Sequence, residues 1–228
     1  MHASAAESGT GTGTEMTGTP PAETISHTPL SIMNMSGLKP ILLASSGLGA
    51  AYMVGAVAVG GDLLVVLGVF VLGVFYWTFL EYILHRWMLH WEPEEKRLRL
   101  IRDCFPSHAP HHRKPLNERK YVWHQVKMTV ALSLVYTAFM CLFIPFVWSL
   151  ALNAGVLLGY QAYEYVHTAC HQLPMRKGIA RTLKRHHAIH HHRDDRTNFG
   201  VTTTMWDHVF RTNWKPSPRG PGAEPAVS

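Results

Sequence analysis

Histidines are the residues of this chain whose number and spacing point most directly to chemistry. The chain has 16 histidines in 228 residues, against 15 aspartates and glutamates combined. Neutral imidazole is a common ligand for iron, zinc and copper. Ten of the histidines fall into four short clusters, in the order HxxxxH, HxxHH, HxxxH and HxxHH: His85, His90, His108, His111, His112, His167, His171, His187, His190 and His191. A single HxxHH is weak evidence for a metal site, but four ordered clusters predict one.

The spacing within each cluster determines which histidines can share a metal ion. Residues three and four apart lie on one face of a helix, so the HxxxH pair can share an ion, and so can the three members of each HxxHH cluster. His85 and His90 are five apart and would point about 140° from each other on an ideal helix. They suit a frayed helix end or two different metals. His186 and His192 are interpreted as neighbours of the ligands on a basic helix face, without a role in binding.

The clusters also form an internal repeat. LEYILH at 80–85 resembles YEYVH at 163–167, and an HxxHH cluster begins 16 to 18 residues after the second histidine of each half. The repeat predicts that each half supplies five histidines to a centre with two metals. The sequence leaves the division of the ten histidines between the two metals open.

One carboxylate accompanies the first histidine of each half. Glu81 precedes His85 by four residues and Glu164 precedes His167 by three, so each shares a helical face with its histidine. A carboxylate in a membrane span is costly and usually functional. We expect each to accept the second ring N–H of a ligand histidine and so fix its tautomer. Direct ligation and a glutamate that reaches the membrane interface are the alternatives.

Two long apolar blocks, residues 40–84 and 126–166, must position these side chains. Each has room for two spans of about 20 residues, the length that crosses a bilayer. A soluble protein with two buried hairpins is disfavoured because residues 128–144 show no polar stripe. We therefore predict an all-α integral membrane protein with four transmembrane helices in two hairpins and a cytosolic helical cap that carries the metals. The predicted spans are 40–59, 63–84, 127–145 and 147–166.

Charge indicates the orientation of the spans. Ten of the 21 lysines and arginines lie in residues 86–127, ten lie from Arg176 onwards, and Lys39 is the last. Four spans place all of them on one side, which the positive-inside rule assigns to the cytoplasm. The net charge of +6 is therefore a topology signal and does not indicate nucleic-acid binding. We expect a multi-pass protein with both termini and the metal centre cytoplasmic, in a bacterial inner membrane or the endoplasmic reticulum.

The remaining segments carry less information. Residues 1–37 are rich in Gly, Thr, Ser and Ala and predict a disordered tail, as does the Pro- and Gly-rich segment 215–228. Residues 38–214 are expected to form one membrane domain. The three cysteines lack CxxC spacing and are expected to be free thiols: Cys104, Cys141 and Cys170.

Taken with the histidine order, the sequence resembles the membrane fatty acid hydroxylase/sterol desaturase superfamily, and within it the fatty acid 2-hydroxylase branch. NFGVTTTMWDHVFRT at 198–212 is similar to a motif of that branch, and the resemblance covers roughly residues 75–212. It implies two irons held by the ten histidines at the cytosolic face, with zinc able to replace iron in purified protein. It also implies that O2 and external electrons are used to hydroxylate an acyl chain at C2.

The resemblance also has departures and further implications. Gln172 stands where the family often has another histidine, and Thr168 replaces an aromatic residue. The chain has no HPGG motif of a cytochrome b5 domain, so a separate electron donor of the cytochrome b5, ferredoxin or reductase type is expected. Asn198 and Asp207 join the two glutamates as expected supports of the ligands. Four aromatic residues could line an acyl groove, although packing is the alternative for each: Trp87, Trp91, Tyr163 and Trp206.

Three functions are compatible with these patterns. The first is O2-dependent hydroxylation of a fatty acyl chain that is free, conjugated or part of a sphingolipid. The second keeps the metal centre but acts on a sterol or carotenoid, or removes hydrogen to desaturate. The third is a non-enzymatic membrane protein that binds zinc or copper. Transport of metal would favour polar groups deep within several spans, whereas these histidines are expected at one face.

Overall fold

The computed structural model describes residues 38–91, 93–102, 112 and 122–216. Within these ranges the regular secondary structure is helical and no strand is present. The predicted tail at 1–37 and most of the tail at 215–228 lie outside the described residues, as do His108, His111 and Cys104. Cys141 and Cys170 are free, as expected.

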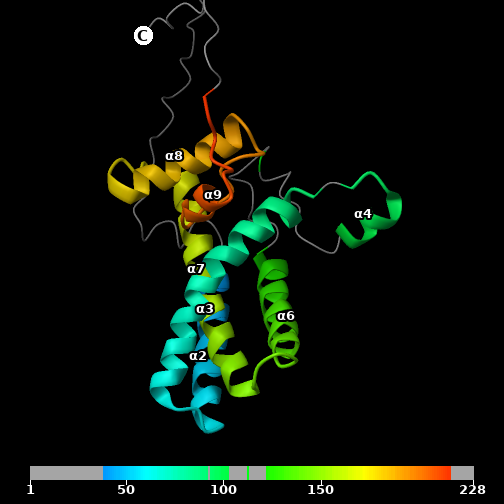
Figure 1. Ribbon diagram of the computed structural model, residues 1–228, viewed down its shortest axis with the longest axis vertical. Coiled ribbons are helices and arrows are strands. Elements are labelled where there is room, and N and C mark those ends of the chain that lie inside the picture. Colours follow the sequence, from blue (N-terminus) through cyan, green and yellow to red (C-terminus); the bar gives the residue numbers. More distant parts are fainter. Residues whose placement is uncertain (1–37, 92, 103–111, 113–121, 217–228) are drawn as a thin grey trace, which may run out of the picture.

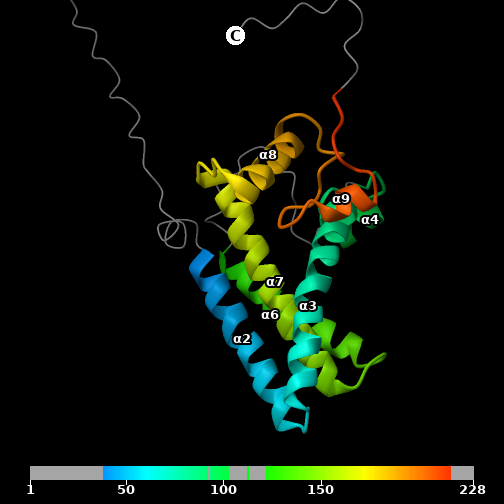
Figure 2. The ribbon, with the colours of Figure 1, turned by 60° about the vertical axis from the view of Figure 1, so that its left-hand side comes forward.

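Four long helices form a bundle: α2 (Leu38–Ala58), α3 (Leu63–Ile83), α6 (Val122–Met140) and α7 (Phe146–Gln172). The α2–α3 and α6–α7 turns lie together at one end of the bundle, and α7 contacts the other three helices (Figures 1 and 2). Pro145 precedes α7, where its missing N–H leaves no helical bond unmade. With 27 residues, α7 runs about 40 Å and extends six residues beyond the predicted span, which brings His167 and His171 onto it.

Two of these helices are long and apolar enough to cross a membrane. They are α2, with a mean hydropathy of 1.7, and the helix over Leu63–Leu89, with 2.5; no other helix in the described ranges meets this measure. Side chains such as Leu64 and Val71 are 78% and 63% exposed on the bundle surface. Apolar surface of this extent is typical of a face that another apolar phase covers.

Helices α3 and α7 make the closest approach in the bundle, through a pair of glycines. A Cβ added to Gly155 would overlap the Phe70 carbonyl oxygen, and one added to Gly73 would overlap the Leu152 carbonyl oxygen. Small residues at helix crossings are the usual way for membrane helices to pack backbone against backbone. The relative position of α3 and α7 therefore depends on these two residues, and both helices lead to histidines.

Polar side chains fix α6 against the rest of the bundle. Asn153 of α7 is 1% exposed, and its Nδ2 donates to the Ser133 carbonyl oxygen at 2.8 Å and to Thr137 Oγ1 at 2.5 Å. Ser133 Oγ in turn donates to the Tyr52 hydroxyl of α2 at 3.2 Å. Hydrogen bonds between buried groups specify one register, because a slip would leave these groups unpaired.

The shorter helices lie at the other end of the bundle. The end of α3 continues as a π-helix, η1 (Leu84–Leu89), and α8 (Gly178–His192) crosses the end of α7. Helix α9 (Met205–Val209) lies beside the end of α3 (Figure 2), while α4 (Lys96–Arg102) stands to one side in Figure 1. This end carries every described histidine of the four clusters.

Candidate metal centre

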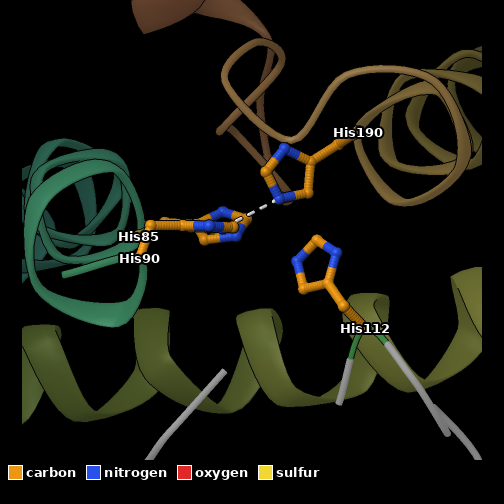
Figure 3. A group of neighbouring side chains, drawn as sticks. All are labelled: His85, His90, His112 and His190. Carbon is orange, nitrogen blue, oxygen red and sulfur yellow. Dashed lines mark hydrogen bonds between the residues drawn. The ribbon is translucent and has the colours of Figure 1, made fainter. Parts of the chain in front are cut away.

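The eight described cluster histidines form two groups of four. Group one consists of His85, His90, His112 and His190, and group two of His167, His171, His187 and His191. In each group, one ring nitrogen from every histidine lies within 4.8 Å of the others. Ligands on opposite sides of one ion, at about 2.1 Å each, lie about 4 Å apart. Figure 3 shows the four rings of group one converging from η1, α8 and the segment around His112.

Ring nitrogens face each other at short distances within both groups. His90 Nε2 lies 3.1 Å from His190 Nε2, and His171 Nε2 lies 3.0 Å from His187 Nε2. Two neutral imidazole lone pairs repel at this distance, so a proton or a shared cation must lie between them. The donor sets therefore fit metal ions of the kind that bind imidazole.

The two histidines five residues apart converge because α3 changes its hydrogen-bonding pattern. Residues 84–89 are a π-helix, in which bonds run from i to i+5 and the turn is wider. This turn places His85 and His90 on one side, with ring centroids 5.1 Å apart. The divergence of about 140° holds for an ideal α-helix; of the two predicted arrangements, an altered helix end is the one found, and both histidines belong to group one.

Helix α8 serves both groups. His187 and His191, one turn apart, have ring centroids 4.4 Å apart and belong to group two, whereas His190 turns toward group one. The three members of this HxxHH cluster, which the spacing allows to share one ion, are therefore divided between the two groups. The division of the histidines, which the sequence left open, thus crosses the two halves of the repeat, because α8 lies between the two groups and contributes histidines to both.

Backbone carbonyls, rather than carboxylates, hold the outer ring nitrogens of two histidines of group one, His85 and His190. His85 Nδ1 donates to the Phe199 carbonyl at 2.5 Å, and His190 Nδ1 donates to the Thr197 carbonyl at 2.7 Å. Each bond assigns the N–H to Nδ1 and leaves the Nε2 lone pair for the centre of the group. Residues 197–202, which supply both carbonyls, are called the strap below.

Glu81 holds the strap and not the ring of His85. Its buried carboxylate accepts hydrogen bonds from the Val201 and Thr202 N–H groups at 2.6 and 2.9 Å, and from the Thr202 hydroxyl. The expectation of a direct bond to His85 was wrong, because the strap passes between the two side chains. The side chain of Glu81 acts on the histidine only through that backbone.

Asp207 holds the other side of the strap. It accepts from the Phe199 and Gly200 N–H groups at 2.9 and 2.7 Å and from His186 Nε2 at 2.9 Å. Burial alone would raise the pKa of Asp207, but the hydrogen bonds from His186, Thr212 and the strap lower it below its ordinary value. Asp207 therefore stays ionised and acts on the histidines of group one indirectly, through the strap.

His186 has a role that the sequence interpretation missed. It is 9% exposed and bonded to Asp207, and is not a neighbour on an open basic face. The signal was present in the sequence: Leu183, His186, His187 and His190 fall at i, i+3, i+4 and i+7 and form the buried stripe of α8. His192, by contrast, is exposed.

Asn198 shapes the strap between its two carbonyls. It has φ 58°, a left-handed conformation that asparagine tolerates better than most residues. Its Nδ2 donates to the His186 carbonyl at 3.2 Å, and its Oδ1 accepts from the Trp214 N–H at 2.8 Å. Asn198 thus supports the ligands by holding the backbone and not by touching a ring.

The other predicted residues fall in different surroundings. Glu164 is partly buried on α7, one turn before His167, and its support of a ligand stays a prediction. Tyr163 stacks on His167 with centroids 5.4 Å apart. Trp206 donates from Nε1 to Thr78 Oγ1 at 3.0 Å and packs on Phe79, so packing explains it.

Trp87 lies within η1 and Trp91 just after it, and no contact among the described residues assigns either of them to a substrate. Trp87 is 53% exposed, and the Arg86 guanidinium lies 4.8 Å from its ring centroid. Trp91 is partly buried directly after η1. Their contact with a substrate stays a prediction.

The metal-free protein should lose stability as the pH falls. Burial, with smaller contributions from nearby histidines, lowers the pKa of His190 from 6.5 to about 3, and burial lowers that of His187 as well. Between pH 6.5 and a pH of about 3, His190 is protonated in the unfolded chain and neutral in the folded chain. Stability is therefore fully present above pH 6.5 and falls below it by about 1.4 kcal/mol per pH unit for each such histidine.

Thermal unfolding of the chelator-treated protein measures this effect when it is repeated at several pH values over a range of about 3 pH units, from about 7.5 to about 4.5. His190→Ala should reduce the slope, and replacing the exposed His192 by alanine should leave it unchanged. A slope that is the same in all three proteins would contradict the prediction.

Known proteins share these features. The fatty acid hydroxylase family model matches residues 70–212, which include both histidine groups and the strap. The chain is 34% identical over 149 residues to fatty acid 2-hydroxylase of Mus musculus, covering 65% of this chain and 40% of that protein. It is 29% identical over 168 residues to dihydroceramide fatty acyl 2-hydroxylase FAH1 of Arabidopsis thaliana, covering 69% of this chain and 65% of that protein.

A yeast protein matches in sequence, and a solved structure matches in fold. Ceramide very long chain fatty acid hydroxylase SCS7 of Saccharomyces cerevisiae is 34% identical over 146 residues, or 63% of this chain and 37% of that protein. A structure of full-length scs7p, in which only the hydroxylase domain is visible, superposes with a TM-score of 0.66 at 27% identity, covering 87% of this chain and 70% of that one. The chain thus spans less than half the length of the mouse and yeast relatives.

Proposed function

Because the chain belongs to the fatty acid hydroxylase family, we propose that it is an O2-dependent di-iron enzyme that hydroxylates a fatty acyl chain at C2. The resemblance based on the histidine order and residues 198–212 is confirmed by the family match. The mouse and Arabidopsis relatives are named as 2-hydroxylases of fatty acid and dihydroceramide fatty acyl groups, which supports an acyl substrate and the C2 position for this chain.

The observation that carries the proposal is the pair of four-histidine groups at one end of an apolar bundle. Hydroxylation of an unactivated C–H bond requires an oxidant that amino-acid side chains cannot supply, and bound iron would supply it. Group one and group two would hold the two irons, with zinc able to take their place in purified protein. His108 and His111 complete the proposed ligand set and lie outside the described residues.

The chain itself contributes geometry. Bonds to the strap keep Nδ1 of His85 and His190 protonated and direct Nε2 toward the centre. Four histidines are buried or nearly buried, His85, His167, His187 and His190, and would limit the access of water to a bound metal. Tyr163 stacks on His167 and would be the first aromatic contact of a chain that reaches group two. Positioning the acyl carbon against the metals is the main task left to the protein.

We further propose that α2, α3, α6 and α7 all cross the membrane with the histidine end in the cytoplasm. The two turns at the opposite end, residues 59–62 and 141–145, contain no lysine or arginine. The histidine end contains many of both, and residues 165–193 hold six lysines and arginines without an aspartate or glutamate. This asymmetry follows the positive-inside rule. Helix α7 has a lower hydropathy because it carries polar residues, among them His167 and His171 of group two.

External electrons would come from a separate protein of the cytochrome b5, ferredoxin or reductase type. The outer side of α8 presents two arginines, Arg181 and Arg185, on the same helix that carries histidines of both groups. This positive charge supports a donor protein with an acidic surface. Complementary charge would orient such a donor over the centre.

Expression of the chain in a host without 2-hydroxylated lipids tests the proposal. Cells that also receive a reductase and cytochrome b5 should form 2-hydroxy fatty acid, and a fatty acid deuterated at C2 should lose one deuterium. Under oxygen-18 gas, the new hydroxyl should carry the heavy isotope, because its oxygen comes from O2. A product that has lost two hydrogens would show a desaturase, and hydroxylation of sterol alone would show another substrate class. Either outcome contradicts the proposal.

A further inference from the structure

We propose that the strap, residues 197–202, prepares group one and not group two for its metal, with Glu81 as the positioning residue that anchors it. The two metal positions are then unequal, and group one binds its ion more tightly. This inference rests on the proposed function only in taking the two histidine groups as metal sites. It concerns binding and needs neither lipid nor O2.

The strap acts on group one through two carbonyls. Those of Thr197 and Phe199 flank the left-handed residue Asn198 and accept from His190 and His85. The two histidines come from different helices, α8 and the end of α3, so a single backbone segment sets the ring orientation of both. Moving this segment would release both Nδ1–H groups together.

Every backbone N–H of residues 198–202 has an acceptor. The N–H of residue 198 donates to the Thr212 carbonyl at 2.9 Å. Those of 199 and 200 donate to Asp207, and those of 201 and 202 donate to Glu81. Buried carboxylates hold N–H groups more strongly than neutral acceptors do. Two buried carboxyl groups, those of Glu81 and Asp207, therefore hold the strap in one backbone conformation.

Gly200 shows how closely the strap is held. A Cβ at this position would overlap the Thr203 carbonyl oxygen and lie 3.0 Å from Asp207 Oδ2. The carboxylate can approach two successive N–H groups only because residue 200 has no side chain. The segment thus has little room to shift while Glu81 and Asp207 stay in place.

Group two has a histidine without such support. His187 Nδ1 is buried and has no hydrogen-bond partner among the described residues. Its proton position is not set by a carbonyl, so this ring must select a tautomer when it binds metal. Orientation of ligands before binding raises affinity, because less freedom is lost on binding. Group one is prepared in this way at His85 and His190, which gives it the higher affinity.

Glu81 is the better residue for a test than Asp207. It lies on α3, one helical turn before His85, and its hydrogen bonds go to the strap. Asp207 is also bonded to His186, so its replacement would disturb α8, which serves both groups. A selective effect can therefore be expected only at Glu81.

Cobalt(II) titration of the metal-free protein in detergent, followed by absorption and elemental analysis, measures each position. The wild-type chain should bind two equivalents of different affinity. Glu81→Ala should weaken the tighter equivalent by about 10- to 100-fold, the usual effect of losing a group that orients a ligand, and leave the weaker one unchanged. His187→Ala should remove the weaker equivalent, and the equivalent that remains should still be sensitive to Glu81→Ala.

Asp195→Ala is the matched control, since Asp195 is an exposed carboxylate in the segment before the strap, and both affinities should stay at wild-type values. Two equal equivalents in the wild type, equal weakening of both by Glu81→Ala, or no weakening would each overturn the inference. If Glu81→Ala also lowers the helical content, Glu81→Met decides by the same criterion, because methionine keeps the length of the side chain and removes both acceptor oxygens. The titration stands whether or not the protein hydroxylates lipid, so the two proposals fail separately.

Discussion

Replacing His190 by alanine should reduce the 2-hydroxy fatty acid made by expressing cells to the level of the empty host. His190 is fully buried, its Nε2 lies 3.1 Å from that of His90, and its Nδ1 is bonded to the Thr197 carbonyl. Loss of a group that only orients a ligand lowers activity by about 10- to 100-fold. Loss of the ligand itself should exceed the upper end of this range.

Comparative lipid mass spectrometry of cells that express each variant at equal levels measures the effect. His192→Ala is the matched control: it lies on the same helix, two residues later, but its side chain is exposed, and product should stay at the wild-type amount. The purified His190→Ala protein should also retain metal in group two. Undiminished product from His190→Ala would remove group one from the proposed mechanism.

That the cluster histidines gather together could be predicted from the sequence, but their grouping could not. All eight described cluster histidines lie in the two groups, since chain order and spacing identify a repeated pattern. Their division depends on two features without a clear local signal. One is the π-helix that turns His85 and His90 to the same side, and the other is the position of α8 between the two groups. Both are set by how the helices pack, and an ideal helix does not represent them.

The supporting residues show a similar limit. Glu81, Asn198 and Asp207 were expected to support ligands; Asn198 belongs to the strap that bonds to His85 and His190, and Glu81 and Asp207 accept hydrogen bonds from it. Helical spacing placed Glu81 on the correct face but could not show that a segment 120 residues later comes between it and the ring. Contacts between residues so far apart in sequence require the fold.

His186 illustrates the opposite error. It was set aside because it did not fit the HxxHH spacing, whereas burial on α8 follows a stripe that includes it. The hydrogen bond to Asp207 offsets the free-energy cost of burying the His186 ring, which would be large for an unpaired polar group. The amphipathic pattern of α8 therefore held information that the ligand motif alone did not.

Replacing Gly155 by alanine should destabilise the bundle and also lower its metal content. The added Cβ would overlap the Phe70 carbonyl oxygen and lie 2.8 Å from the Val74 backbone nitrogen. These atoms belong to the backbone of α3 and cannot move aside by a side-chain rotation, so the two helices must separate. Overpacking of this kind costs about 1–3 kcal/mol, and more where the backbone cannot relax.

Gly68→Ala is the matched control for this substitution. Gly68 lies inside α3, where a new Cβ would meet nothing within 4 Å. Alanine favours helix over glycine by about 1 kcal/mol, so Gly68→Ala should keep or raise the midpoint of thermal unfolding while Gly155→Ala lowers it. The comparison separates helix propensity, which is the same in both variants, from contact between helices.

The loss of metal in Gly155→Ala follows from where the two helices lead. The end of α3 carries His85 and His90, and the end of α7 carries His167 and His171. Separation of α3 from α7 at the crossing changes the distance between the two groups, and α8, which supplies ligands to both, cannot follow both movements. Gly155→Ala should therefore bind less than two equivalents of metal at a temperature where it is still folded. Full metal content with a lowered unfolding midpoint would show that the crossing supports the fold without setting the geometry of the site.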